Sequence, residues 1–351
     1  GERPEAELLA VMKHVRFAAM AEGFLRETVG AWPALRSAEG RDVLFNAVLP
    51  LVGGTKVVPR LGFGPRLIYV LGGYKEGGEE HRTVELYDPQ AASWTQLADM
   101  TGPRAAHGCV ALDGKLYAVG GVGVADQYLD TAEVYDPQTD GWQPLAKMST
   151  TRCEFGLAAV GGKMYAIGGT DNGGYPLNSV EAYDPQLGAW TLVASMSGKR
   201  FAHASVVLDG KIYIIGGLDD NEEEAVTVEV YDPQTDSWQQ VASMPHGLYS
   251  HAAAAMGGKI YVTGGRNEEM SEDSSAYVYD PQADAWTQLA SMSNVRRGHA
   301  SAAVGGKLYV FGGHNAEGRL STVEVFDPAS DSWAQVSSLT SVRDSMVAVA
   351  L

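Results

Sequence analysis

Histidines and arginines recur in this sequence at fixed positions, and both residue types could do chemistry. An arginine precedes a histidine by three residues, as in Arg104 and His107. One repeat position carries His107, His203, His251 and His299, with Phe155 and Met346 completing the set. Four imidazoles in a ring could hold a metal ion, but no carboxylate or thiolate stands at the same level. Since Phe155 shows that a hydrocarbon is accepted there, we favour structural, hydrogen-bonded histidines over a metal site.

The arginines pair with glutamates at a second repeat position. The pairs are Arg343 with Glu85, Arg104 with Glu133, Arg152 with Glu181, Arg200 with Glu229 and Arg296 with Glu324. In the fifth copy, where residues 245–251 read PHGLYSH, both partners are lost together, because Leu248 and Tyr277 occupy the two positions. Breaking one partner of a buried ion pair costs about 3 to 5 kcal/mol, whereas exchanging both for apolar groups can be neutral. We therefore predict structural bridges, and favour them over a ring of arginines that grips an acidic ligand.

An internal repeat must position these residues. Double glycines begin at 72, 120, 168, 216, 264 and 312, a step of 48 residues, and each copy adds Asp-Pro and then a tryptophan. Within one copy, residues 107–112, 115–121, 132–136 and 141–146 have the composition of short strands. Six such units without intervening helices predict an all-β fold, a six-bladed β-propeller.

The ends of the repeat region predict how the ring closes. The first copy begins at its second strand, RLIYVLGG, while the chain ends in SVRDSMVAVAL, which matches a first strand. We therefore expect the C-terminal strand to complete the first blade. Glycine or alanine at 108, 156, 204, 252 and 300 predicts that this first strand is innermost in each blade. The repeated tyrosine and tryptophan should fill the spaces between blades.

The double glycine, the Tyr-Asp-Pro and the tryptophan, in this order and spacing, resemble the kelch repeat. The resemblance covers residues 66–351, with residues 55–65 as a linker. Before it, residues 5–52 have apolar residues at helical spacing, and LLAVMKHVRFAAM, FLRETV and RDVLFNAVLPLV are similar to the second half of a BACK domain. Residues 1–54 are thus expected to be BACK-like helices, with an unrelated helical cap as the alternative.

Composition excludes several classes of function. The net charge of −17 provides no basic surface for nucleic acid. No apolar run approaches the length of a membrane span, and the first residues lack the features of a signal peptide. The two cysteines, Cys109 and Cys153, fall at different depths of the predicted fold, so we expect free thiols and an intracellular, cytoplasmic or nuclear protein.

The predicted strand directions place the long, dissimilar loops and the connections between blades on one face. Variable loops on a rigid scaffold are where recognition is usually built. Kelch-like ubiquitin-ligase receptors bind a short substrate peptide on this face, and the resemblance implies the same role for the residues after the double glycines and after the bridge arginines. The candidate peptide-binding residues are Tyr74, Thr170, Leu218, Phe201, Tyr249, Ser250, Arg266, Asn267, Arg297, His314 and Asp344.

Two loops on this face are strongly acidic. LDDNEEEAVT and RNEEMSEDSS, residues 218–227 and 266–275, hold nine acids in twenty residues. They could steer a basic partner toward the face, although solvated, self-repelling loops are the simpler interpretation.

The resemblance implies a binding module rather than an enzyme, without catalytic residues or a cofactor. It would present substrates for a kelch-like adaptor of a cullin-RING ubiquitin ligase, whose BTB domain, absent here, would hold the cullin. An actin-binding scaffold is the alternative. A galactose-oxidase-like or metal-dependent enzyme is least favoured, since neither cysteine lies among tyrosine and histidine ligands and no nucleophile-base-acid set stands out.

Overall fold

The computed structural model describes residues 67–351, which form one compact unit, Leu67–Leu351. The predicted BACK-like helices and the linker, residues 1–54 and 55–65, lie outside the described residues.

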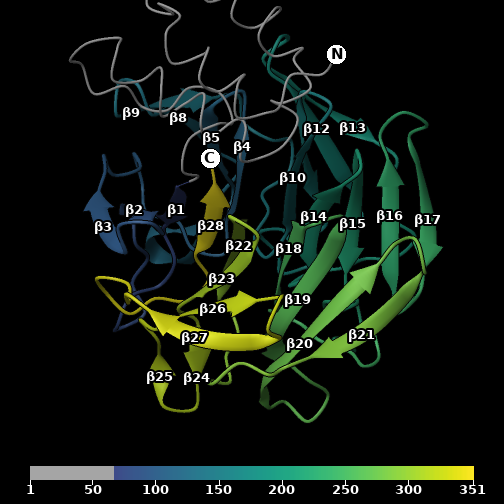
Figure 1. Ribbon diagram of the computed structural model, residues 1–351. Coiled ribbons are helices and arrows are strands. Elements are labelled where there is room, and N and C mark those ends of the chain that lie inside the picture. The colour runs from purple at the N-terminus through teal and green to yellow at the C-terminus, as the bar shows by residue number, and fades with distance from the viewer. Residues whose placement is uncertain (1–66) are drawn as a thin grey trace, which may run out of the picture. The chain divides into compact units, whose positions relative to one another are not determined.

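The described chain folds into six four-stranded antiparallel sheets, the blades, arranged around a central axis (Figure 1). This confirms the predicted propeller. Blade 1 contains β28 (Val347–Ala350), β1 (Ile68–Leu71), β2 (Val84–Asp88) and β3 (Ser93–Gln96). Blade 2 contains β4 (Gly108–Leu112), β5 (Lys115–Val119), β8 (Ala132–Asp136) and β9 (Gly141–Leu145). Blade 3 contains β10 (Gly156–Val160), β11 (Lys163–Ile167), β12 (Val180–Asp184) and β13 (Ala189–Val193).

The other three blades have the same order of strands. Blade 4 contains β14 (Ala204–Leu208), β15 (Lys211–Ile215), β16 (Val228–Asp232) and β17 (Ser237–Val241). Blade 5 contains β18 (Ala252–Met256), β19 (Lys259–Arg266), β20 (Glu272–Asp280) and β21 (Ala285–Leu289). Blade 6 contains β22 (Ala300–Val304), β23 (Lys307–Phe311), β26 (Val323–Asp327) and β27 (Ser332–Val336).

Two small hairpins extend the loops of blades 2 and 6. Blade 2 carries β6 (Val122–Gly123), the 3-10 turn η5 (Val124–Asp126) and β7 (Gln127–Tyr128). Blade 6 carries β24 (His314–Asn315) and β25 (Gly318–Arg319). Both hairpins follow a double glycine, so they stand on the loop-rich face.

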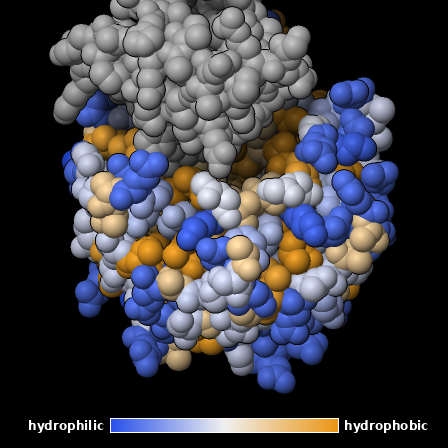
Figure 2. Space-filling model, viewed as in Figure 1, coloured by the Kyte–Doolittle hydropathy of each residue, from blue (hydrophilic) through white to orange (hydrophobic). Residues whose placement is uncertain are grey.

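The burial of each strand follows its place in the blade. The second strands, such as β5 and β15, are buried on both faces because the neighbouring blades cover them, which explains their continuous apolar sequences. The outermost strands, such as β17, are largely exposed. Hydrophilic side chains accordingly cover much of the visible outer surface in Figure 2, with hydrophobic ones between them.

The C-terminal strand closes the ring, as predicted. β28 pairs with β1 in antiparallel register, with Tyr69 opposite Val349, and lies between β1 and the inner strand of blade 6 (Figure 1). The indole Nε1 of Trp94 in blade 1 donates to the carbonyl of Ser337, 3.2 Å away at the end of blade 6. The two ends of the repeat region are therefore held by the same kind of contact as any other pair of blades.

Aromatic side chains fill the spaces between blades, again as predicted. Tyr69 of blade 1 packs edge-on against Tyr135 of blade 2, with 6.3 Å between the ring centroids. Trp142 of blade 2 reaches back, and its Nε1 donates to the carbonyl of Ala98 at 3.0 Å. Such contacts contribute on the order of 0.5 to 1.5 kcal/mol beyond area burial.

The first strand of each blade is innermost, where the six strands converge. A Cβ at Gly108 would lie 2.5 Å from the Cβ of Leu157 in the next blade, so the close approach of these strands requires glycine there. Within residues 67–351, no helix is long and apolar enough to cross a membrane.

Candidate functional site

The predicted arginine-glutamate bridges are present in five blades. The N–O separations are 2.9 Å for Arg343–Glu85 and Arg104–Glu133, 3.0 Å for Arg152–Glu181, 3.2 Å for Arg200–Glu229 and 2.5 Å for Arg296–Glu324. All ten side chains are buried, at most 6% exposed. The structural interpretation is therefore confirmed, because solvent and ligands do not reach these arginines.

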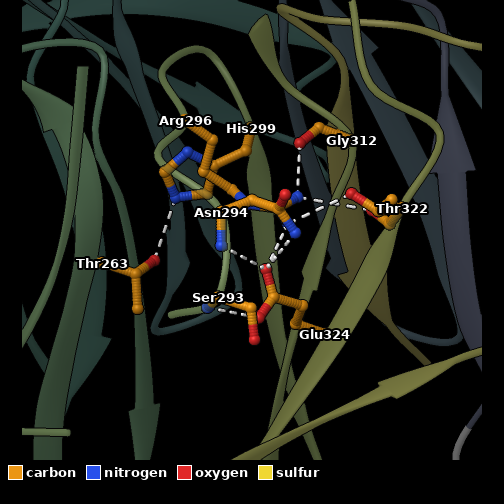
Figure 3. Close-up of polar contacts among 8 residues, drawn as sticks. All are labelled: Thr263, Ser293, Asn294, Arg296, His299, Gly312, Thr322 and Glu324. Carbon is orange, nitrogen blue, oxygen red and sulfur yellow. Dashed lines mark hydrogen bonds and ion pairs between the residues drawn. The ribbon is translucent and has the colours of Figure 1, made fainter. Parts of the chain in front are cut away.

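Each bridge belongs to a wider hydrogen-bond network, shown for blade 6 in Figure 3. Arg296 donates to the carbonyl of Gly312 at 2.6 Å and to Thr322 Oγ1 at 3.2 Å. The other oxygen of Glu324 accepts from the backbone N–H of Ser293 at 2.7 Å. Burial opposes the charged form of Glu324, but the hydrogen bonds from Ser293 and the neighbouring arginine hold its pKa below the ordinary value. The network joins the connection between blades to two strands of one blade.

Blade 5 lacks this network. Besides Leu248 and Tyr277 it carries a third change, which the sequence comparison missed. Where blades 2, 3, 4 and 6 have a serine or threonine whose backbone N–H donates to the glutamate, blade 5 has Pro245, which has no N–H. Leu248 is buried in an apolar cluster with Met244 and Val262. β19 and β20 also pair beyond the double glycine, as far as Arg266 opposite Glu272. Because Pro245 has no N–H, the loss of the acceptor glutamate in blade 5 leaves no backbone donor unpaired at residue 245.

The four histidines pack between blades, but the predicted hydrogen bond is missing at His107, where neither ring nitrogen has a partner. A Cβ at Gly121 would lie 2.6 Å from the Cβ of His107, and the His107 ring lies over Gly72 of the preceding blade. Burial lowers the pKa of His107 and His203 to about 3 and that of His251 to about 4, so these rings are neutral at pH 7. His299 Nε2 is 3.0 Å from Thr263 Oγ1 (Figure 3). Among residues 67–351, no three His, Cys, Asp or Glu side chains are grouped to hold a metal ion.

Both cysteines are free and buried, as the sequence predicts. Burial raises the pKa of the Cys109 thiol to about 12 and that of the Cys153 thiol to about 11. Both thiols therefore stay protonated at neutral pH.

On the loop-rich face, the two predicted positions meet within each blade. The residue after the double glycine forms an isolated antiparallel bridge with the residue after the arginine position, as between Tyr249 and Arg266, whose backbone groups exchange hydrogen bonds of 2.8 and 3.0 Å. The six pairs are Tyr74–Asp344, Ala105–Val122, Cys153–Thr170, Phe201–Leu218, Tyr249–Arg266 and Arg297–His314. Nine of the eleven predicted site residues belong to these pairs.

The ring of pairs has two chemically different halves. Blades 2 to 4 contribute uncharged side chains, from Ala105–Val122, Cys153–Thr170 and Phe201–Leu218. Blades 5, 6 and 1 contribute Tyr249–Arg266, Arg297–His314 and Tyr74–Asp344. Ala105, Val122, Cys153 and Thr170 are at most 6% exposed, so on the uncharged side a partner meets chiefly Phe201 and Leu218 of blade 4.

Ion pairs connect the charged half across blade boundaries. Glu272 Oε1 is 3.3 Å from Arg297 Nε and 3.9 Å from Arg266 Nη2. Arg319, from the blade 6 hairpin, reaches blade 1, where its Nε is 3.3 Å from Asp344 and its guanidinium is 5.8 Å from the Tyr74 ring centre. Burial raises the pKa of Asp344, although Arg319 and His314 oppose the shift. The rim arginines are 23% to 34% exposed, unlike the bridge arginines.

The remaining predicted residues lie apart from the ring of pairs. Ser250 lies one step inward, at the mouth of the central channel. Asn267 is used by its own loop, since its Oδ1 accepts from the backbone N–H of Glu269 and Ser271. The sequence reasoning missed Arg319 and Glu272. Arg319 lies on the blade 6 hairpin and Glu272 on β20, and each reaches a charged residue of the next blade.

The channel mouth is a ring of six residues, one per blade. Each donates its backbone N–H to the carbonyl of its counterpart in the preceding blade, over 2.7 to 3.0 Å, and the hydrogen bonds close into a circle. The six are Ala106, Glu154, Ala202, Ser250, Gly298 and Ser345, and they open into a cavity of about 150 Å³. Glu154 was also missed, although an alignment of the copies shows it as a lone carboxylate among small residues.

Comparison with known proteins agrees with this architecture. The model of the KLHDC2/KLHL20/DRC7 Kelch-repeats domain matches residues 51–217 and 202–349. This chain belongs to the Kelch-repeat family. Kelch-like ECH-associated protein 1A of Danio rerio is 33% identical over 109 residues, which are 31% of this chain and 18% of that protein's length. The solved structure of YjhT matches with a TM-score of 0.68 at 18% sequence identity. The match covers 78% of this chain and 95% of the YjhT chain, and it shows a similarity of fold.

Proposed function

We propose that this Kelch-repeat propeller binds a protein partner, through a short segment of it, on the loop-rich face. The observation that carries the proposal is the ring of six backbone-paired positions, which holds half-exposed Tyr249, Arg266 and Arg297 on a rigid framework. Tyrosine and arginine are the residues that most often anchor protein interfaces. The candidate residues in this ring are proposed to contact the partner.

The finer proposal is a substrate-binding module of a kelch-like adaptor for a cullin-RING ubiquitin ligase. The similarity to Kelch-like ECH-associated protein 1A supports a kelch-like context. In this proposal a BTB domain and BACK-like helices, beyond the described residues, connect the propeller to the cullin. The propeller itself acts by binding rather than by catalysis, which agrees with two protonated thiols and four neutral, packed imidazoles.

The test is proximity labelling by the full-length protein, compared with a Tyr249→Ala and Arg297→Ala double variant. We expect the double variant to lose the labelling of specific partners. Its labelling of ubiquitin-ligase subunits should remain. A matched control is Lys163→Ala, which removes an exposed pair with Asp184 on the opposite face. Equal labelling by wild type and the double variant would contradict the proposed face, and recovery of actin filaments without ligase subunits would favour a cytoskeletal scaffold.

A further inference from the structure

Glu154 is the single charged residue of the channel mouth. The other five positions carry glycine, alanine or serine, so their side chains leave the opening clear. All six residues have φ between 48° and 58°, which keeps each side chain in an equivalent place on the ring. The Glu154 side chain is exposed to solvent at the mouth. Its carboxylate is therefore accessible to a group that enters the channel from the loop-rich face.

The surroundings favour a cation beside Glu154. Although Glu154 is exposed, protein surrounds the mouth, and the resulting partial desolvation of the carboxylate raises its pKa, while Arg297 opposes this effect less strongly. The bridge arginines nearby are buried and already paired, so they do not neutralise it. A cation that paired with Glu154 would replace the missing hydration with a charge-assisted hydrogen bond.

The cavity below the mouth contains unused hydrogen-bonding groups. His107 is 5% exposed, lines the cavity, and neither of its ring nitrogens has a hydrogen-bond partner. A second cavity of about 200 Å³ adjoins the first, and both are lined by His107, Phe155 and His251. Since His107 is neutral at pH 7, one nitrogen can accept a hydrogen bond from an entering donor. The wall therefore suits an entering cationic donor.

We propose that the channel mouth is a binding site for a lysine side chain of the partner, whose ammonium group enters the mouth, pairs with Glu154 and donates to His107 below it. This deepens the proposed function and depends on it, because the lysine arrives on a partner segment bound to the loop-rich face. The acidic loops of blades 4 and 5, on the same face, favour the approach of such a basic segment.

The direct test uses two small probes, Nα-acetyl-lysine amide and its uncharged counterpart Nα-acetyl-norleucine amide. We expect the lysine probe to shift the imidazole Cε1–H signal of His107 saturably in a ¹H–¹³C NMR titration, and the norleucine probe to have no such effect. In Glu154→Gln the dissociation constant should rise on the order of tenfold, as expected for the loss of a charge-assisted hydrogen bond. Glu154→Gly, which adopts the residue of blade 6, should give the same loss.

Asp113→Asn is the matched control, because Asp113 is also an exposed acid with positive φ, but lies in the turn between β4 and β5 on the opposite face. It should leave the titration unchanged. Absence of a shift in the wild-type protein, equal binding of norleucine amide, or an equal loss in Asp113→Asn would each overturn the proposal.

Partner labelling separates this proposal from the proposed function. If Tyr249→Ala with Arg297→Ala loses partners but Glu154→Gln keeps them all, the face is functional and the lysine site is wrong. If none of these variants loses partners, the proposed function itself fails.

Discussion

At the scale of single residues, arginine has two roles that its position in the repeat separates. The bridge arginines donate to a glutamate, a glycine carbonyl and a hydroxyl, as Arg296 shows. The rim arginines, such as Arg297, have longer contacts and remain partly exposed. Truncation of the first kind should therefore affect stability, and truncation of the second should affect binding.

The bridge can be tested in blade 4 by copying blade 5. Arg200→Ala leaves Glu229 buried without its charge partner, so we expect a loss of about 3 to 5 kcal/mol in unfolding free energy. The combination of Ser197→Pro, Arg200→Leu and Glu229→Tyr removes the donor, the cation and the anion together, and should recover most of that loss. Urea denaturation measures both. An unchanged unfolding free energy in Arg200→Ala would refute the bridge.

The buried histidines make stability depend on pH with a definite sign. The folded-state pKa of His107, about 3, is below the unfolded value of about 6.5, so the unfolded state binds more protons between these limits. The stability contributed by the neutral ring is therefore complete above pH 6.5 and is lost as pH falls toward 3.

His107→Phe should reduce this pH dependence, since Phe155 already stands at the same repeat position in blade 3. Between pH 3 and pH 6.5, the slope of unfolding free energy against pH should decrease by about 1.4 kcal/mol per pH unit. Urea titrations at pH 6.0, 5.0 and 4.0 would measure it. A slope identical to that of the wild type would show that His107 titrates normally in the folded state.

At the scale of the element, the turn between the third and fourth strands of a blade hydrogen-bonds to the preceding blade in some copies and not in others. In blade 4, Asp236 Oδ1 accepts from Tyr231 Oη at 2.6 Å and from the backbone N–H of Ala194 in blade 3 at 2.9 Å. Blade 3 has Gly188 at the equivalent position, which removes the carboxylate that would reach Tyr183 and Ala146.

Gly188→Asp should therefore stabilise the protein. Gly188 has φ of 64°, close to the values of the turn aspartates, and a Cβ there would meet no atom within 4 Å. Two new hydrogen bonds should add on the order of 1 to 2 kcal/mol. Thermal unfolding of Gly188→Asp beside Gly188→Ala, which lacks the carboxylate, would separate hydrogen bonding from backbone effects. Equal melting temperatures for the two variants would contradict the prediction.

At the scale of the whole molecule, stability depends on closure of the ring. The last strand, β28, contacts β1, the inner strand of blade 6 and β4. Removal of residues 346–351 deletes β28 and Met346, so blade 1 loses its inner strand and the spaces on both sides lose a wall. We expect the ring to open rather than fray.

Small-angle scattering and calorimetry would measure this outcome as a larger radius of gyration and the loss of a single cooperative transition. Removal of Leu351 alone, which takes away one short backbone pairing with Leu67, is the control and should have little effect. A truncated protein that unfolds cooperatively at the wild-type temperature would contradict closure by β28.

Much of this molecule could be predicted from sequence because the repeat makes each position visible six times. The strand order, the closing strand, the inter-blade tyrosines and the paired loss at Leu248 and Tyr277 all follow from comparison of the copies. The two rows of candidate site residues were also found in this way, because their positions share one register.

Tertiary structure alone decided which of these side chains contact one another and which hydrogen-bond within their own loop. Arg319 reaches Asp344 and Tyr74 across a blade boundary because the β24–β25 hairpin bends toward blade 1, whereas Asn267 is consumed by its own loop. The accessibility of Glu154 depends on six chain segments meeting in one hydrogen-bonded circle. Local sequence specifies each blade through short-range pairing, but distances between blades arise from packing of residues far apart in the chain.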